Sequence, residues 1–226
     1  AWGDVFNFSV YVNDYDLDLV NCTLEISKDK IIWNVINSTI INGTGLCSFN
    51  VTFDCSQIGI NYFRFSLNDL INDVVYTEIK NFTLTKNPVK LELLIGNDSS
   101  VIRNYGSTSL GVSVYDLIRN SKVGSQYPEA QVTFNVTFDG LNYLKLGTVT
   151  TASGDASITF APDCTYNVGT QYWVAYVEND ACYQNAVSDN YIVKIIGTLN
   201  PKVVEPVNGL KYWRGENVTI RANVTD

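Results

Sequence analysis

Residues 6–12 read Phe-Asn-Phe-Ser-Val-Tyr-Val, in which apolar side chains alternate with more polar ones. Alternation with a period of two is typical of a half-buried β-strand. Similar short runs, rich in Val, Ile, Thr, Tyr and Phe, occur at 49–53, 62–67, 131–138 and 172–177. Turn residues separate the runs, as at Asn42-Gly43 and Asp139-Gly140, which is the pattern of antiparallel β-structure. We therefore predict an all-β fold of immunoglobulin-like β-sandwiches.

The strand pattern is itself repeated along the chain. Residues 6–12 are matched by 109–114 and by 218–224. A second pair of runs, 63–67 and 173–177, repeats in the same way, and Asn and Asp residues follow each run. The interval of about 102 to 110 residues is the size of one immunoglobulin-like sandwich. The sequence therefore predicts tandem immunoglobulin-like β-sandwiches.

Domain boundaries follow if the first run of each repeat is strand B and the second is strand F. We predict an immunoglobulin-like domain at 1–86 that lacks strand A, a second at 87–197, and the first two strands of a third at 198–226. Asn87-Pro88 and Asn200-Pro201 mark the junctions, because a residue before Pro favours extended backbone. Two interpretations stay open: a segment of a longer array, and a filament subunit whose incomplete sandwich accepts a neighbour's strand.

Three stretches resemble the immunoglobulin-like and PKD-like repeats of prokaryotic, especially archaeal, surface proteins. Residues 3–16 resemble strand B with its following loop, 59–69 resemble strand F, and 205–226 resemble the opening of another repeat. Leu17 stands where the PKD loop usually has Gly. Proteins with such repeats include surface-layer proteins, giant adhesins and spacer modules of surface enzymes. The resemblance implies a fold and a cell-surface location rather than a chemistry.

Composition excludes several classes of function. The chain has 226 residues, no His and a formal charge of −8. Without His, Ser–His–Asp triads and His-ligated zinc sites are excluded. The acidic charge disfavours nucleic acid and anionic membranes, and no apolar run is long enough to span a bilayer. We expect no nucleic-acid partner, no membrane insertion in this segment and no enzymatic activity. Because Ala1 replaces an initiator Met, we interpret the chain as a processed product or an excised piece.

The N-glycosylation motif Asn-x-Ser/Thr is more frequent than chance would give. Ten copies occur, whereas 25 Asn and 35 Ser plus Thr in 226 residues lead to about four. They begin at Asn7, Asn21, Asn37, Asn42, Asn50, Asn81, Asn97, Asn135, Asn217 and Asn223. N-linked glycans at several of these positions would add bulk and solubility to exposed faces and would place the chain outside the cell. The alternative is that Asn-Val-Thr is an ordinary strand and turn pattern.

Acidic residues gather in two predicted loops of the first domain, after strands B and F. These loops leave a sandwich at the same end, and clustered oxygen ligands suit Ca²⁺. The candidate calcium ligands are Asp14, Asp16, Asp18, Asp69 and Asp73. Asp116 with Asn179 and Asp180 forms a weaker candidate in the second domain. The alternative is that these residues only form turns, for which Asp and Asn are well suited.

Five cysteines are an odd number for an apparently oxidising compartment. Strand F separates Cys164 from Cys182 by about 25 Å, whereas a disulfide needs Cα atoms within roughly 7 Å. In a head-to-tail array the E–F end of one sandwich faces the F–G end of the next, so we predict an interdomain bridge from Cys55 to Cys182. Cys22 and Cys47 point inward and would pair within the first domain. Cys164 then stays unpaired in this segment, and a Cys164–Cys182 bridge remains the alternative.

These features predict a structural extracellular glycoprotein segment: a rigid immunoglobulin-like repeat rod of an archaeal surface layer or surface filament. Its partners would be neighbouring copies or other surface proteins, and we expect no cofactor besides Ca²⁺. The alternative is an adhesin stalk or a carbohydrate-binding module of a surface protein. In the second case Trp33, Trp173 and Trp213 would form a surface on which sugars stack.

Overall fold

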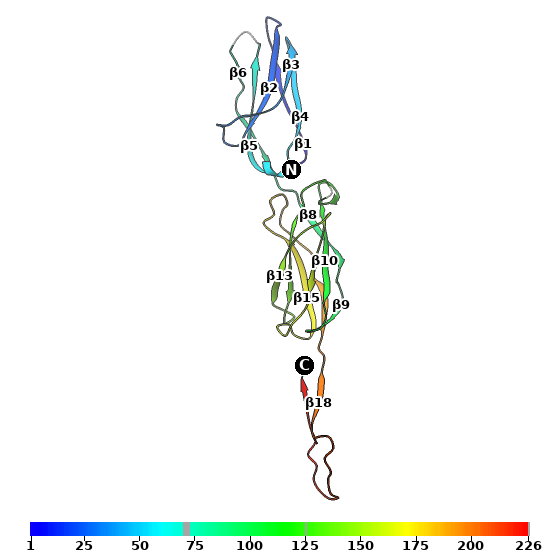
Figure 1. Cartoon of the computed structure of the whole chain (residues 1–226). Coiled ribbons are helices and arrows are strands. Elements are labelled where there is room, and N and C mark those ends of the chain that lie inside the picture. The colour runs from blue at the N-terminus through cyan, green and yellow to red at the C-terminus, as the bar shows by residue number, and fades with distance from the viewer. Residues whose placement is uncertain (70–72, 125, 226) are drawn as a thin grey trace. The chain divides into compact units, whose positions relative to one another are not determined.

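The computed structural model describes residues 1–69, 73–124 and 126–225, and the fold is all-β (Figure 1). The only helical segment in these residues is a single 3-10 turn, η1 (Cys55–Gln57). No helix in this part of the chain is long and apolar enough to cross a membrane.

The chain divides into two compact units. Unit 1 consists of Ala1–Val89 together with two later segments, Asp116–Asn120 and Asn179–Asn185. Unit 2 consists of Lys90–Tyr115, Ser121–Glu178 and Ala186–Asp226. Unit 1 extends past the boundary predicted after residue 86 and includes two segments of the predicted second domain, and the division into three domains stays a prediction.

Unit 1 is a sandwich of two antiparallel sheets. Its strands are β1 (Val5–Val12), β2 (Leu19–Ser27), β3 (Asn34–Asn42), β4 (Gly45–Thr52), β5 (Gly59–Asn68), β6 (Val75–Tyr76) and β7 (Lys80–Leu84). One sheet pairs β1 with β4, and the other has the order β3-β2-β5-β6, with β7 also paired to β5. The stretch 6–12 thus lies within β1, where Phe8 and Val12 are buried and Asn7 and Ser9 are exposed.

The Cys22–Cys47 disulfide joins these two sheets through the core of unit 1. Cys22 lies on β2 and Cys47 on β4, both are fully buried, and their Cα atoms are 6.5 Å apart. Aromatic rings also pack against one another in unit 1, and the rings of Phe8 and Phe63 lie edge to face with centroids 4.9 Å apart. The inward-pointing cysteines are the pair that the sequence predicts within this domain.

Unit 2 is a second sandwich. Its strands are β8 (Val89–Ile95), which begins at the last residue of the main unit 1 segment, β9 (Ser99–Ile102), β10 (Thr108–Asp116), β11 (Ser121–Lys122), β12 (Gln131–Thr137), β13 (Tyr143–Thr150), β14 (Asp155–Phe160), β15 (Gly169–Val177), β16 (Ala186–Val187) and β17 (Tyr191–Ile196). One sheet has the order β11-β10-β14, with β8 on β10, and the other has the order β13-β12-β15-β17-β9, with β16 on β15. Val112, Phe134 and Trp173 are fully buried between the sheets.

The last strands, β18 (Asn200–Glu205) and β19 (Arg221–Thr225), form a separate antiparallel two-stranded sheet. The run 218–224 that the sequence predicts as a strand therefore begins later, at Arg221. Side chains of β19 are exposed throughout. That this sheet opens a third sandwich stays a prediction.

One pair of hydrogen bonds recurs at equivalent places in the two units. In unit 1 the backbone N–H of Phe65 donates to the Thr77 hydroxyl, and the N–H of Thr77 donates to the Phe65 carbonyl. In unit 2 Ala175 and Ser188 exchange the same two bonds. The residue that follows the short strand β6 or β16 is therefore bonded to the neighbouring strand in the same way, and Phe65 corresponds to Ala175.

Carboxylates in the turns stabilise the fold in their ionised form. Asp29 accepts the backbone N–H groups of Ile32 and Ile31, and these bonds hold its pKa below the ordinary value of 3.8. Asp139 accepts the N–H of Asn142, with the same effect on its pKa. A carboxylate whose pKa is lowered by folding contributes stability that is present above its pKa in the unfolded chain and is lost as the pH falls through its pKa in the folded chain.

We therefore expect the urea concentration at the midpoint of unfolding, followed by circular dichroism, to decrease below about pH 4. A midpoint that rises there would contradict this assignment.

Candidate functional site

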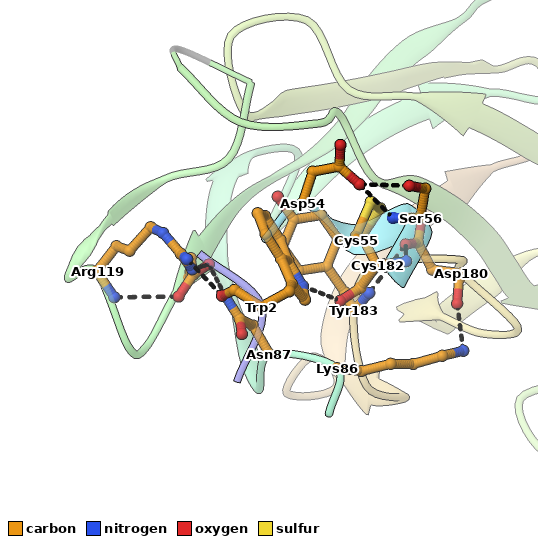
Figure 2. Close-up of a disulfide and its surroundings, with 11 residues drawn as sticks. Trp2, Asp54, Cys55, Ser56, Lys86, Asn87, Arg119, Asp180, Cys182 and Tyr183 are labelled. Carbon is orange, nitrogen blue, oxygen red and sulfur yellow. Dashed lines mark hydrogen bonds and ion pairs between the residues drawn. A yellow bond between two sulfur atoms is a disulfide. The ribbon is translucent and has the colours of Figure 1, made fainter. Parts of the chain in front are cut away.

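A disulfide surrounded by buried polar and aromatic side chains forms the candidate site of unit 1 (Figure 2). It joins Cys55, the first residue of η1, to Cys182 in the segment Asn179–Asn185. The two cysteines are 127 positions apart in the sequence, and their Cα atoms are 5.1 Å apart. Asp54 holds the beginning of η1 by accepting the backbone N–H of Ser56. This is the second pair of cysteines that the sequence predicts, but both cysteines belong to unit 1, so the bridge is not the interdomain link that we expected.

Trp2 is held beside this disulfide by three contacts. Its indole N–H donates to the carbonyl oxygen of Cys182 over 2.6 Å. Its ring meets the ring of Tyr183 edge to face, with centroids 5.7 Å apart. The guanidinium of Arg119 lies 4.4 Å from the centre of the same ring, a cation–π arrangement that is strengthened by burial. Trp2 therefore joins the segments that carry Cys182 and Arg119 to the beginning of the chain.

Asp116 is the polar centre of the site, and its side chain is fully buried. One carboxylate oxygen accepts the side-chain amide of Asn87 at 2.7 Å and the guanidinium of Arg119 at 2.8 Å. The other oxygen accepts the backbone N–H groups of Ile118 and Arg119. A second nitrogen of the Arg119 guanidinium donates to the carbonyl oxygen of Trp2 at 2.6 Å. A buried carboxylate is tolerated when it is paired and hydrogen-bonded in this way.

The segment Asn179–Asn185 is fixed by its own carboxylate and by the chain at residues 86–87. Asp180 accepts the backbone N–H groups of Cys182 and Tyr183. The ammonium group of Lys86 donates to the carbonyl oxygen of Asp180. The backbone N–H of Asn87 donates to the carbonyl oxygen of Cys182 at 3.2 Å. Hydrogen bonds therefore fix the backbone on both sides of the cysteine.

The chemistry of the site is that of an anchor between chain segments. Its ionised side chains are engaged with one another or with backbone groups, and its sulfur atoms form a covalent bond. Sequence reasoning found the two cysteines and considered Asp116 and Asp180 only as weak calcium ligands. It missed Trp2 and Arg119, since no local motif marks either residue as a partner of a distant loop.

The acidic residues proposed as calcium ligands are only partly brought together. Asp14, Asp69 and Asp73 line one hollow of about 530 Å³ in unit 1, whereas Asp16 and Asp18 lie outside its lining. In the described residues no three side chains of Asp, Glu, Cys or His form a group that could hold a metal ion. The five-carboxylate set is therefore not assembled, and calcium binding stays a prediction.

Asp14 has a structural role in its own loop. Its two carboxylate oxygens accept the backbone N–H groups of Asp16, at 3.4 Å, and of Asp18, at 2.8 Å. Leu17 adopts a φ of 61° between them, which is the left-handed region that Gly would enter without strain. The loop thus makes its turn without the glycine of the PKD pattern, and hydrogen bonds to Asp14 support it.

Most of the glycosylation motifs lie on exposed surface. All of the ten asparagines are exposed except Asn21 and Asn135, which are half-buried. The side-chain oxygen of Asn135 is buried on β12 and has no hydrogen-bond partner in the structure. Asn135 is therefore the least suitable of the ten for carrying a glycan.

The tryptophans proposed as a carbohydrate surface have different environments. Trp173 is fully buried in the core of unit 2 and offers no face for stacking. Trp33 is covered by the guanidinium of Arg64, 4.2 Å from its ring centre. Trp213 is 82% exposed. Cys164 is also exposed and keeps a free thiol, which accepts a hydrogen bond from the side-chain amide of Asn104.

Comparisons with known proteins identify no family and find distant structural likenesses. No family model and no curated protein sequence matches the chain. The chain is similar to a solved tetra-tandem repeat in the extending region of a large adhesion protein, with 14% identity and a TM-score of 0.47. The likeness covers 91% of this chain, and the chain spans about half of that protein (53%). A red sea bream transglutaminase is similar at 10% identity over 86% of this chain and 29% of that chain, with a TM-score of 0.30. Likenesses at this level say nothing about what the chain binds or does.

We predict that Asp116→Asn destabilises unit 1 by about 2–4 kcal/mol, because Arg119 would be left buried without its counter-charge. Asp54→Asn, an exposed cap beside the same disulfide, is the matched control. Asn and Asp cap equally well, so its unfolding free energy should change by less than about 0.5 kcal/mol. Urea unfolding followed by circular dichroism measures both. If both substitutions changed the free energy of unfolding equally, the buried ion pair of Asp116 and Arg119 would make no specific contribution to stability.

Proposed function

We propose that the chain is a structural segment of an extracellular surface glycoprotein, and that the Cys55–Cys182 disulfide carries mechanical load in it. The observation that supports this role most directly is the covalent bond between residues 127 positions apart. A force applied to the two chain ends passes along the backbone to Cys55, crosses the disulfide and leaves through Cys182. Residues 56–181, which include most strands of unit 2, are thereby removed from the loaded path.

The cluster around the disulfide strengthens this role. Trp2, Asp116 and Arg119 hold the segments on either side through a cation–π contact, an ion pair and hydrogen bonds. Non-covalent contacts alone would break and re-form under load. The disulfide is covalent and keeps the segments that make these contacts together. Disulfides of this kind are typical of oxidising, extracellular compartments, which is consistent with a surface location.

Within this proposal we assign the segment to a surface layer or surface filament of archaeal type, with neighbouring copies or other surface proteins as its partners. An adhesin stalk would meet the same mechanical demand, because it also transmits force between a cell and its attachment point. The proposed role is non-enzymatic in both cases. Electron microscopy separates them, since a surface-layer or filament protein assembles into a lattice or fibre and a stalk does not.

Stretching single molecules tests the load path. Of the 225 chain steps between the ends, the two disulfides bypass 127 and 25. The oxidised chain should therefore extend to a contour length of roughly 260 Å, against roughly 790 Å after reduction, at about 3.5 Å per residue. Replacing Cys55 and Cys182 by Ser should restore most of the difference. Cys164→Ser is the control and should leave the contour length of the oxidised chain unchanged. The load path is wrong if the doubly substituted and parent chains extend equally under oxidising conditions.

Glycosylation is proposed for several of the exposed motifs. We expect glycans on material from the natural source at a subset of exposed asparagines such as Asn37, Asn42 and Asn50, and none at Asn135. A glycan needs a solvent-accessible side-chain nitrogen, and the Asn135 side chain is half-buried in a sheet. Mass spectrometry of glycopeptides measures occupancy at each position. Bare peptides at all exposed motifs, or a glycan at Asn135 alone, would contradict this proposal.

A further inference from the structure

Unit 1 contains an apolar groove of about 610 Å³ between β1 and residues 77–82. Five phenylalanine rings line it, those of Phe6, Phe8, Phe63, Phe65 and Phe82, and those of Phe6, Phe63 and Phe82 are half-buried rather than buried. In the part of the chain that the structure describes, β1 pairs only with β4, and β7 pairs only with β5. The second edges of β1 and β7 therefore border the groove without a partner strand.

Unit 2 contains the filled counterpart of this groove. With Phe65 equivalent to Ala175, Phe63 corresponds to Trp173 and the β7 residue Phe82 corresponds to Val193 on β17. Trp173 and Val193 are fully buried, unlike their counterparts. The difference lies in β8 and β9, because β8 pairs with β10 and β9 pairs in parallel with β17.

The segment 90–102 covers the core of unit 2 with apolar side chains and a backbone hydrogen bond. Leu91 and Val101 are buried, and the carbonyl oxygen of Gly96 accepts the indole N–H of Trp173 at 3.2 Å. A Cβ atom at Gly96 would lie 2.4 Å from the carbonyl oxygen of Ser109, so the bend between the two strands requires glycine. This cover is an extended polypeptide with spaced apolar side chains and a glycine bend.

Backbone groups at the edge of β17 show how such a segment is held. The carbonyl oxygens of Ile192 and Ile196 accept the N–H groups of Asp98 and Arg103. Every second residue of β17 therefore faces β9. In unit 1 the last of these bonds is repeated, because the N–H of Trp2 donates to the carbonyl oxygen of Thr85.

The repeat places the backbone groups of Asn81 and Thr83 on β7 toward the groove, in the positions that β9 satisfies in unit 2. A small apolar ligand would cover the phenylalanine rings but would leave these N–H and C=O groups without partners. A polypeptide strand does both, and added strands bind sheet edges in this way in many proteins.

We propose that the groove between β1 and β7 binds an extended polypeptide strand, parallel to β7, of the chemistry of residues 90–102. Its spaced apolar side chains cover the phenylalanine rings, its glycine bend passes over β1, and its backbone bonds to Asn81 and Thr83. With the strand bound, the core of unit 1 would be covered as β8 and β9 cover the core of unit 2.

The test uses the intact chain and a fluorescein-labelled peptide with the sequence of residues 87–102. We expect saturable binding with one peptide per chain, measured by fluorescence anisotropy. Hydrogen exchange followed by mass spectrometry should then slow in β1 and β7. Thr83→Pro removes the backbone N–H at the groove edge and should weaken peptide binding by about tenfold or more, the loss expected for one hydrogen bond.

Thr83→Ala is the matched control, because it removes the same exposed side chain and the same glycosylation motif at Asn81 but keeps the N–H. It should bind the peptide like the parent chain. The proposal is wrong if millimolar peptide leaves exchange in β1 and β7 unchanged, or slows it only in β10 and β17. It is equally wrong if Thr83→Pro binds as tightly as Thr83→Ala, or if the groove is already covered by a second copy in a dimer.

Discussion

The Cys55–Cys182 disulfide is the constraint on which the organisation of unit 1 depends. It brings a loop from late in the chain to the first sandwich, and Trp2, Asn87 and Tyr183 pack around that loop. Closing a loop of this length removes several kcal/mol of conformational entropy from the unfolded chain, about 5 kcal/mol in the chain-entropy model. The buried ion pair of Asp116 and Arg119 would be costly by itself. It is tolerated because both oxygens of the Asp116 carboxylate are hydrogen-bonded, one to Asn87 and Arg119 and the other to backbone N–H groups.

Much of the fold was predictable because it depends on local patterns. Alternating side chains in 6–12 and 62–67 indicate β1 and β5 correctly, since one face of each strand is buried. The cysteine pairs were predictable for a different reason. The length of a strand limits which residues can meet, so a bridge between Cys164 and Cys182 across one strand was disfavoured, and the inward-pointing Cys22 and Cys47 suited a bridge within one domain.

The rest of the site could not be read from the sequence, because its contacts join residues with no fixed spacing. Arg119 follows Asp116 by three residues, which suggests a local pair, but nothing in either marks Trp2 as their neighbour. The acidic loop shows why composition alone leaves two uses open. Asp14, Asp16 and Asp18 have the composition of a calcium loop, yet the Asp14 carboxylate is used to hold the turn. Composition cannot distinguish these uses, since both require oxygen atoms close to a bend.

Peptide mapping of the oxidised chain without reduction measures the disulfide pairing itself. The structure predicts one linked peptide that contains Cys55 and Cys182, a second that contains Cys22 and Cys47, and an unlinked peptide that contains Cys164. A peptide that links Cys164 to Cys182 would contradict the anchor between distant segments, and with it the load path through unit 1.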